Sequence, residues 1–418
     1  MAFRIPKLSF VCPFCFDQVR ANEVVYRCIN GWCPAYNEED PVYAAYLGVP
    51  TVRSGHVFMD ARRGLSSFIN KSVTCKECGH PAIKVCPRCH STLPDTTLTG
   101  DNNIISIIGT RSSGKSLYIG VLINELQKRI APSLGASMQG FVDMSGLYNA
   151  QELYNKTKYD KLYKDGEILG QTMRHQRMRS GDDQDKTPLV YRFAYVNNKF
   201  GRLDDFTLAF FDGAGEDFED ASLTATAARY IAHSKGIIFL LDPLQIPEVL
   251  EQVEAHLGHK STSTGTGDSG LASPDVVLSN ITSLIKQSIG HSRIEIPVAI
   301  SFSKFDAIQS IIPDGLVISQ TSPHCKKGVL DDTDVQNINA EIRSLLATWN
   351  QQSLLTAIEL DYKNYSFFTV SSLGLDNEPD SSGKIKKPRP HRVEDPLLWL
   401  MAENKLLMIE GQPNAPRR

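Results

Sequence analysis

The segment "GTRSSGKS" at residues 109–116 combines the residue types and the spacing that bind nucleotide phosphates. Glycines let the backbone wrap around an anion, so that its N–H groups and the start of the following helix point at phosphate oxygens. Lys115 places a positive charge at the β and γ phosphates, and the Ser116 hydroxyl can ligate Mg²⁺. We therefore expect a nucleoside triphosphate to bind at Gly109, Ser112, Ser113, Gly114, Lys115, Ser116 and Leu117.

Two more candidate residues for this site follow an apolar run further along the chain. "LAFFD" ends at Asp212, a carboxylate placed to hold Mg²⁺ through water. Gly215 follows three residues later and can offer a backbone N–H to the γ phosphate. We expect both residues beside the phosphate-binding loop.

The segment "SKFD" carries a lysine and an aspartate with the chemistry of a base site. The Asp306 carboxylate can accept hydrogen bonds from both N1–H and the exocyclic amine of guanine, which adenine cannot match. The stem of Lys304 can lie over the ring. Later, a backbone amide in "SSL" at 371–373 can meet the guanine carbonyl. The base is therefore predicted to contact Lys304, Asp306, Ser371, Ser372 and Leu373.

These residues need strands to position them, and the chain from residue 104 onward alternates strand-like and helical stretches. This alternation predicts an α/β fold with a largely parallel sheet. In such a sheet, ligands gather at the carboxyl ends of the strands. The final segment, 395–409, is predicted to form an amphipathic helix that packs on the sheet. The predicted strands are "NIISIIG" (103–109), "LVYRFAYV" (189–196), "TLAFFD" (207–212), "GIIFLLD" (236–242), "IPVAISFS" (296–303) and "SFFTVS" (366–371).

Four motifs in this order resemble those of P-loop GTPases of the translation-factor and Ras-like class: "GTRSSGKS", "DGAGE", "SKFD" and "SSL". The resemblance covers roughly residues 100–410 and implies GTP binding and hydrolysis to GDP and phosphate. More closely, the chain resembles bacterial double-GTPase-type proteins, on the cysteine ribbons before the loop, "FFDGAGED", "ARYIAHSKGIIFLLDPLQIP" and "EDPLLWL". That resemblance implies a role in multi-gene conflict or defence systems.

The chain departs from the GTPase pattern at the residues that such proteins use for switching and catalysis. The switch threonine that would reach Mg²⁺ is either Thr172 or Thr187, and both stay open. Glu216 stands where Ras-like proteins carry glutamine, and it either orients the attacking water or continues a solvated acidic run. Arg111 acts as an internal arginine finger, blocks an outside finger or points to solvent, and these three alternatives stay open. We therefore expect slow hydrolysis, with Lys115 assisting as the phosphate-site cation.

Eight of the nine cysteines lie in residues 12–89 as four close pairs, which is typical of zinc ligands in a reducing compartment. Four thiolates complete one tetrahedral site, so the pairs predict two zinc ions. Sequential pairing of the cysteine pairs is the simplest arrangement, and an exchange of pairs between the two sets stays open. Iron-sulfur ligation is a lesser alternative. The two sequential sets are Cys12, Cys15, Cys28 and Cys33, and Cys75, Cys78, Cys86 and Cys89.

Composition limits the partners. The formal net charge is −3, and residues 1–95 hold eleven Lys and Arg against eight Asp and Glu, a local balance of +3. This balance is too mild to favour nucleic acid, so we expect the ribbons to have a protein-docking or structural role. The longest apolar run, "GIIFLL", is far shorter than the roughly 20 residues of a membrane span. No signal peptide is evident at the start, so we expect a cytoplasmic protein.

The predicted organisation is two Cys₄ zinc-ribbon modules at 1–95, a linker at 96–103 and a Ras-like GTPase domain at 104–418, with insertions at 140–187, 257–275 and 376–392. We expect a GTP-binding, slowly hydrolysing, magnesium-dependent switch whose 140–187 and 213–235 segments respond to the γ phosphate. Its ribbons and switch loops would dock a protein partner. Alternatives are a nucleotide-binding scaffold with little hydrolysis and an ATP-using NTPase.

Overall fold

The structure is a computed structural model of the chain of 418 residues. The residues that the structure describes are 8–35, 39–60, 73–99, 101–109, 112–169, 187–197, 202–212, 225–257, 274–375, 377, 379–407 and 409–410.

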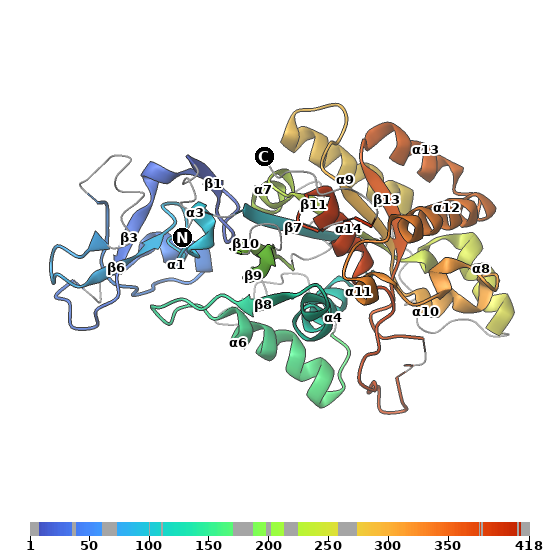
Figure 1. Cartoon of the computed structure of the whole chain (residues 1–418), viewed down its shortest axis with the longest axis horizontal. Helices are drawn as coiled ribbons and strands as arrows, with labels where there is room; N and C mark the ends of the chain where they lie inside the picture. Colours follow the sequence, from blue (N-terminus) through green and yellow to red (C-terminus); the bar gives the residue numbers. More distant parts are fainter. Residues whose placement is uncertain are drawn as a thin grey trace. The chain divides into compact units, whose positions relative to one another are not determined.

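The described strands form three sheets (Figure 1). The largest has seven strands in the order β13-β12-β11-β7-β10-β9-β8. Its neighbours are parallel from β13 through β10, whereas β10 and β9 are antiparallel. Smaller antiparallel sheets pair β1 with β2 and order β4-β3-β6-β5. The strand bounds are β1 Ser9–Val11, β2 Gln18–Arg20, β3 Val25–Cys28, β4 Val57–Phe58, β5 Val73–Thr74, β6 Pro81–Val85, β7 Asp101–Gly109, β8 Ala136–Gly140, β9 Leu189–Asn197, β10 Arg202–Phe210, β11 Gly236–Leu241, β12 Val298–Phe302 and β13 Tyr365–Thr369.

Helices of three kinds connect these strands. The α-helices are α1 Pro41–Leu47, α3 Thr96–Thr99, α4 Lys115–Glu125, α5 Ala131–Ser133, α6 Ala150–Tyr154, α7 Ala225–Ala232, α8 Pro247–Leu257, α9 Pro274–Ile289, α10 Phe305–Ile308, α11 His324–Lys327, α12 Asp332–Thr348, α13 Gln352–Asp361 and α14 Asp395–Glu403. The 3₁₀ helices are η1 Ala21–Glu23, η6 Pro243–Gln245, η7 Gln309–Ile311 and η8 Val317–Ser319. The π-helices are η2 Leu126–Ile130 and η3 Asn155–Asp165.

The chain divides into two compact units. The first comprises Met1–Ile104, Ser137–Asn155 and His175–Phe211, and it contains both smaller sheets and the eight N-terminal cysteines. The second comprises Ile105–Ala136, Lys156–Arg174 and Asp212–Arg418. The phosphate-binding loop and the predicted base residues all belong to the second unit, so the nucleotide site can be described within it. The predicted boundaries at residues 95 and 104 stay a prediction.

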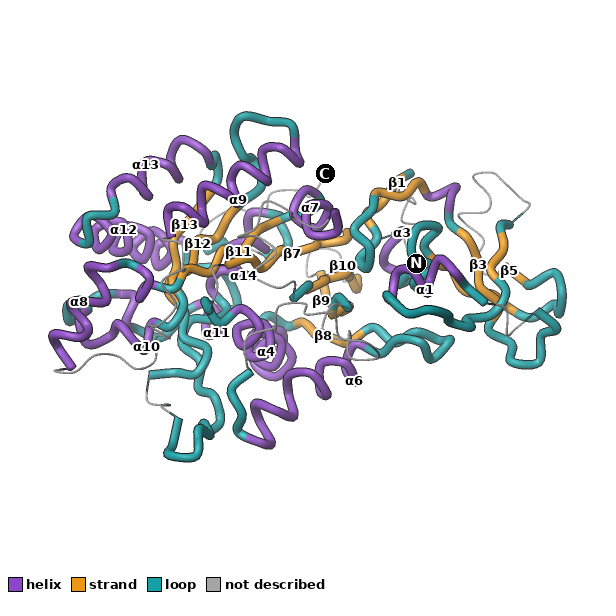
Figure 2. Tube along the Cα trace, turned by 180° about the vertical axis from the view of Figure 1, so that it is seen from behind, coloured by secondary structure: helices purple, strands orange, loops and turns teal. Residues whose placement is uncertain are grey.

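The second unit has a large apolar core built around parallel strands. All six residues of β11, "GIIFLL", are buried, as expected for a strand covered on both faces. Figure 2 shows α9, α12 and α13 around strands β11 to β13. The core draws on β11 and β12 together with apolar residues of α8, α9, α12 and α13. The predicted α/β fold class with a mostly parallel sheet is therefore confirmed.

The C-terminal helix α14 packs on this sheet, as predicted, but it is not amphipathic. Residues 395–402 are all buried. The Trp399 ring lies 5.9 Å from that of Phe368, and the absence of a side chain at Gly236 makes room for Leu400. The prediction of one solvent-facing side was wrong because Asp395, the polar residue at the start of the helix, is itself buried in an ion pair with Arg392.

The predicted insertion at 140–187 contains regular structure in its described part. Asn149 begins α6 by accepting hydrogen bonds from the backbone N–H groups of Gln151 and Glu152, at 3.1 and 3.2 Å. The chain then continues as η3 to Asp165. This segment is therefore more than a polar loop. Across the described ranges, no helix is long and apolar enough to cross a membrane.

Candidate functional site

The phosphate-binding loop joins β7 to α4. Gly109 ends the strand, and a Cβ atom there would lie 2.6 Å from Ser113 Oγ and 2.7 Å from the Leu240 carbonyl oxygen, so glycine is needed for this close approach. Ser112 and Gly114 both have left-handed backbones, with φ of 63° and 76°. Lys115 then starts α4. The strand–loop–helix context that the motif requires is therefore present.

The loop carries buried polar groups. Lys115 is 7% exposed and Ser113 is 2% exposed. The Ser113 hydroxyl has no hydrogen-bond partner in the described part of the chain. A buried hydroxyl of this kind at the turn into a helix suits a ligand that carries acceptor oxygens, as phosphate does.

Asp212, which follows β10, lies among cations. Its Oδ2 atom is 2.5 Å from Lys158 Nζ, and both side chains are 7% exposed. Burial alone would raise the pKa of Asp212, but the charges of Lys158 and Lys115 and hydrogen bonds from Lys158 and Ser116 outweigh burial, so the pKa lies below its ordinary value. The side chains of Lys115, Ser116 and Asp212 therefore interact, as the predicted metal site requires.

The loops that carry the predicted base residues start at the same height in the sheet, because the parallel strands before them end in register. Gly109 pairs with Leu240, and Leu241 pairs with Phe302, which in turn pairs with Thr369. The loops after these strands therefore leave the same edge of the sheet, where ligands of α/β folds bind.

Lys304 contacts an acid that sequence reasoning did not select. It has a left-handed backbone with φ of 53°, and its Nζ lies 2.6 Å from Oδ2 of Asp242, at the end of β11. The other Asp242 oxygen accepts a hydrogen bond from the Leu244 N–H at 3.1 Å. This ion pair fixes the stem of Lys304, the part expected to lie over a base.

Asp306 and Ser371 are brought together. Burial raises the pKa of Asp306, and a hydrogen bond from the Ser371 hydroxyl partly opposes that rise. Ser371 is fully buried and pairs through backbone hydrogen bonds with His391, at 3.0 and 2.8 Å. The His391 ring stacks on Phe305 at 5.3 Å. The two predicted base loops are thus tied together by His391.

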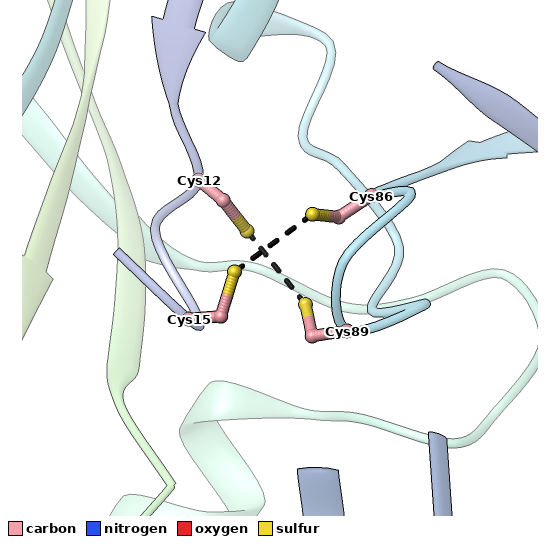
Figure 3. Close-up of side chains that lie close together, drawn as sticks. All are labelled: Cys12, Cys15, Cys86 and Cys89. Carbon is pink, nitrogen blue, oxygen red and sulfur yellow. Dashed lines mark hydrogen bonds between the residues drawn. The ribbon is translucent and has the colours of Figure 1, made fainter. Parts of the chain in front are cut away.

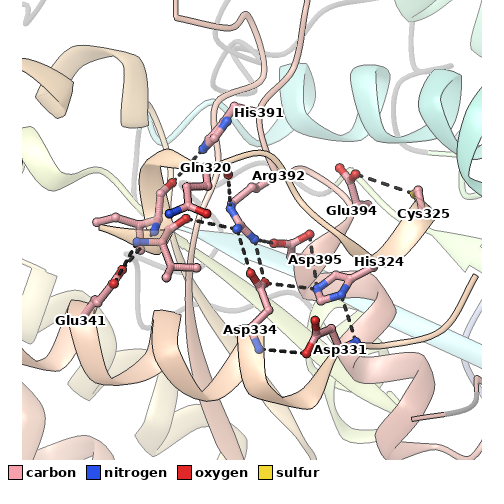
Figure 4. A network of polar contacts seen from close by, with 12 residues as sticks. Gln320, His324, Cys325, Asp331, Asp334, Glu341, His391, Arg392, Glu394 and Asp395 are labelled. Carbon is pink, nitrogen blue, oxygen red and sulfur yellow. Dashed lines mark hydrogen bonds and ion pairs between the residues drawn. The ribbon is translucent and has the colours of Figure 1, made fainter. Parts of the chain in front are cut away.

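Arg392 anchors the segment that carries His391 (Figure 4). Its guanidinium donates to both oxygens of Asp334, at 2.9 and 3.0 Å, and to Asp395 at 2.5 Å. It also donates to the carbonyl oxygens of Gln320 and Val317, at 2.7 and 3.1 Å. All its hydrogen-bonding nitrogens are engaged in a buried network, so this segment is rigidly held.

The network also contains a cluster that resembles a metal site in composition: His324, Asp334 and Asp395 have ligand atoms within 4.8 Å of one another. The hydrogen bonding of His324 argues against a metal. Its Nδ1 atom accepts a hydrogen bond from the Asp331 backbone N–H at 3.1 Å, which leaves the proton of the neutral ring on Nε2. A protonated nitrogen cannot ligate a cation, so this cluster is a charge network.

Several predicted site residues lie outside the described residues: Arg111, Thr172, Gly215 and Glu216. Their roles stay predictions. Thr187 is described, half-buried and two residues before β9, in the first unit. Ser372 and Leu373 are half-buried in the turn after β13. Gly374 in the same turn donates its N–H to Ser371 Oγ at 2.9 Å.

The eight N-terminal cysteines form two clusters, and their pairing differs from the sequential one. Figure 3 shows the sulfurs of the first and last pairs pointing toward one another. The second and third pairs form the other cluster. Of the two arrangements that the sequence left open, the structure has the exchange of pairs and not the simpler sequential pairing, because β3 and β6 pair side by side and bring distant cysteines together. The clusters are Cys12, Cys15, Cys86 and Cys89, and Cys28, Cys33, Cys75 and Cys78.

The sulfur spacing fits zinc. Tetrahedral zinc with Zn–S bonds of about 2.3 Å requires sulfurs about 3.8 Å apart. The sulfurs of Cys12 and Cys89 are 3.8 Å apart, and those of Cys28 and Cys78 are 3.6 Å apart. A hydrogen bond from the His80 backbone lowers the pKa of Cys78 to about 6, which favours the thiolate. Each cluster can therefore hold one zinc ion.

Three of the cysteine loops share one turn. The residue after the second cysteine has a left-handed backbone in each, with φ of 59° at Phe16, 72° at Gly79 and 54° at His90. Its N–H donates to the carbonyl of the first cysteine at 2.9 to 3.0 Å in each. Such repeated turns aim two sulfurs at one point.

Sequence reasoning missed Lys158, Asp242, His391 and Arg392. Lys158 lies in a charged segment that reads as solvated, and its partner is 54 residues away. Asp242 precedes a proline and reads as a turn residue. The strand-end position of Asp242 was the one signal that could have identified it.

Comparison with known proteins agrees with this geometry. A family model described as Double-GTPase 2 matches residues 103–377, a range that includes the phosphate-binding loop, Asp212, Asp306 and Ser371. The chain is also similar to a protein of Mycolicibacterium smegmatis named "Putative ESX-1 scaffolding and assembly protein SaeC", with 27% identity over 413 residues that cover 93% of this chain and 97% of the relative. The predicted resemblance to double-GTPase-type proteins is confirmed: the chain belongs to the Double-GTPase 2 family.

Proposed function

We propose that the protein binds GTP with Mg²⁺, hydrolyses it slowly to GDP and phosphate, and uses the change to control the assembly of a protein complex. The observation that carries this proposal is the shared sheet edge, where Lys115 and Ser116 start α4 and Asp306 and Ser371 interact. Membership of the Double-GTPase 2 family supports guanine nucleotide as the ligand.

In this proposal the polar side chains have separate roles in binding phosphate, metal and base and in hydrolysis. Lys115 stabilises phosphate charge, Ser116 and Asp212 hold the metal, and Asp306 with Lys304 selects guanine. Magnesium, when bound, neutralises charge that develops on the transferred phosphoryl oxygens. Thr172 or Thr187 senses the γ phosphate, and Glu216 and Arg111 act on the attacking water and on transition-state charge.

The zinc modules are proposed to dock a protein partner in the cytoplasm. Trp32, in the loop between Cys28 and Cys33, is 91% exposed. Exposed tryptophan is enriched among residues that dominate binding energy at protein interfaces. The name of the M. smegmatis relative, a scaffolding and assembly protein, favours this role over the conflict or defence role that the sequence resemblance implied.

The same name supports a second candidate, a nucleotide-binding scaffold that barely hydrolyses. Single-turnover phosphate release separates the two. We expect a measurable rate below about 1 per second without a partner, the slow end of the range for such enzymes. Lys115→Ala should abolish release, whereas Lys128→Ala, at an exposed position of η2, should leave it unchanged. Tight GTP binding with no release would favour the scaffold.

A further inference from the structure

The candidate for a further role is Lys158, a buried cation at the metal side of the nucleotide site. Its side chain is 7% exposed, and its ammonium group contacts Asp212 Oδ2 at 2.5 Å. Lysine is rarely buried unless it is paired or functional. Here the partner is the carboxylate proposed to hold magnesium, so the position of Lys158 bears directly on that site.

The two oxygens of Asp212 have different surroundings. Oδ2 is held by Lys158. Oδ1 is buried and has no hydrogen-bond partner in the ranges that the structure describes. A buried carboxylate oxygen normally accepts at least one hydrogen bond, so Oδ1 suits a water molecule bound to a metal ion. Holding one oxygen fixes the orientation of the carboxylate and with it the position of the other.

Helix η3 fixes Lys158 by packing rather than by surface contact. Lys158 and Leu162 are its buried residues. Both face Gly120 of α4, where an added Cβ would lie 3.0 Å from Leu162 Cδ1 and 3.4 Å from Lys158 Cβ. Helix α4 begins at Lys115, so the helix carrying Lys158 packs on the helix that follows the phosphate-binding loop. Lys158 is therefore preorganised, and π-helical turns are frequent at functional sites.

We propose that Lys158 is a positioning residue of the magnesium–nucleotide site: it holds Asp212 through Oδ2 so that Oδ1 is presented to the water shell of the metal. This inference rests on the proposed function. It predicts that Lys158 contributes to the gain in GTP affinity that magnesium provides, and contributes little to binding of metal-free GTP. A purely structural ion pair would affect both affinities alike.

The test is a binding titration of a fluorescent GTP analogue, in excess EDTA and in saturating MgCl₂, on the full chain. In Lys158→Met we expect the magnesium-dependent gain in affinity to fall by about 10- to 100-fold, the usual effect of losing a residue that orients a metal ligand. The EDTA affinity should stay within about threefold of the unmodified protein, as for a residue that does not touch phosphate. Lys158→Arg should retain most of the gain.

The matched control is Lys161→Met, which removes an exposed lysine from the same helix and should behave as the unmodified protein. If Lys158→Met folds poorly, Lys158→Gln keeps a hydrogen-bond donor without the charge and should show the same selective loss. An unchanged magnesium gain in both variants, or equal losses in EDTA and magnesium, would overturn the inference. Absence of GTP binding by the unmodified protein would overturn the proposed function as well. Failure of the proposed function can therefore be distinguished from failure of the inference about Lys158 alone.

Discussion

Replacing Arg392 by methionine tests how much the buried charge network around this residue stabilises the folded protein. The Arg392 side chain is 1% exposed, and its guanidinium donates hydrogen bonds to two buried carboxylates, Asp334 and Asp395. Methionine keeps much of the apolar stem but removes every donor. The two carboxylates would then be left buried without their cation, which is the most costly way to break such a network.

Removing one partner of a buried ion pair costs about 3–5 kcal/mol, and we expect a loss of that size in the free energy of unfolding at about pH 8. Part of this loss should depend on pH through Asp395. Burial raises the pKa of Asp395 to about 6, although the Arg392 charge opposes the rise. This folded-state pKa lies above the unfolded value of about 3.9, so the folded protein takes up more protons as pH falls through 6.

Protonation of Asp395 therefore stabilises the folded state at lower pH, and more so in the variant, whose Asp395 has lost the cation that lowers its pKa. We expect the deficit of Arg392→Met to be about 1–2 kcal/mol smaller at about pH 5 than at about pH 8. Urea unfolding followed by tryptophan fluorescence measures this, because Trp349 and Trp399 are buried in the second unit.

Arg343→Met is the matched control. Arg343 is one-third exposed and pairs with Glu359 at the surface, so its loss should cost less than about 1 kcal/mol. The reasoning would be refuted by a deficit for Arg392→Met no larger than that of the control, or by a deficit that is the same at both pH values.

Three further predictions concern the nucleotide and zinc sites. Asp306→Asn should shift preference from guanine toward xanthine nucleotides, because the amide offers xanthine a donor; unchanged GTP affinity in a binding titration would reject the base assignment. Cys12→Ser combined with Cys86→Ser should remove one zinc ion per chain, whereas Cys12→Ser combined with Cys75→Ser should remove both; loss of both ions from the first variant, as sequential pairing would give, would reject the observed clusters. Gly109→Ala should cost about 1–3 kcal/mol of stability by overpacking, since the new Cβ would lie 2.7 Å from a backbone oxygen on β11, and thermal unfolding within error of the unmodified protein would contradict this.

Local signals in the sequence predicted the strand ends and the phosphate-binding loop. "NIISIIG" is apolar enough to be a buried strand, and glycines followed by Lys115 require a turn into a helix. Parallel strands share their carboxyl edge, so the loops after β12 and β13 bring Asp306 and Ser371 together. These features depend on neighbours in the chain or on one general property of parallel sheets.

Features that depend on distant partners could not be predicted. The Lys158 partner is 54 residues away and the Lys304 partner is 62 residues away, and neither lysine differs in its local sequence from a solvated one. The cysteine pairs are chemically equivalent, so their spacing cannot say which pairs share a metal. The segment 395–409 was predicted to be an amphipathic helix with Asp395 at its start, but Arg392 compensates the charge of Asp395 inside the protein and residues 395–402 are buried.

Calorimetric titration of GTP, GDP and ATP into the zinc-loaded protein with Mg²⁺ tests the central claim most directly. The contacts proposed for Asp306 and Ser371 predict that GTP and GDP bind at least about 100-fold more tightly than ATP, because a site built to hydrogen-bond one base rejects an analogue that leaves its buried groups unpaired. Equal or tighter binding of ATP would contradict the guanine site.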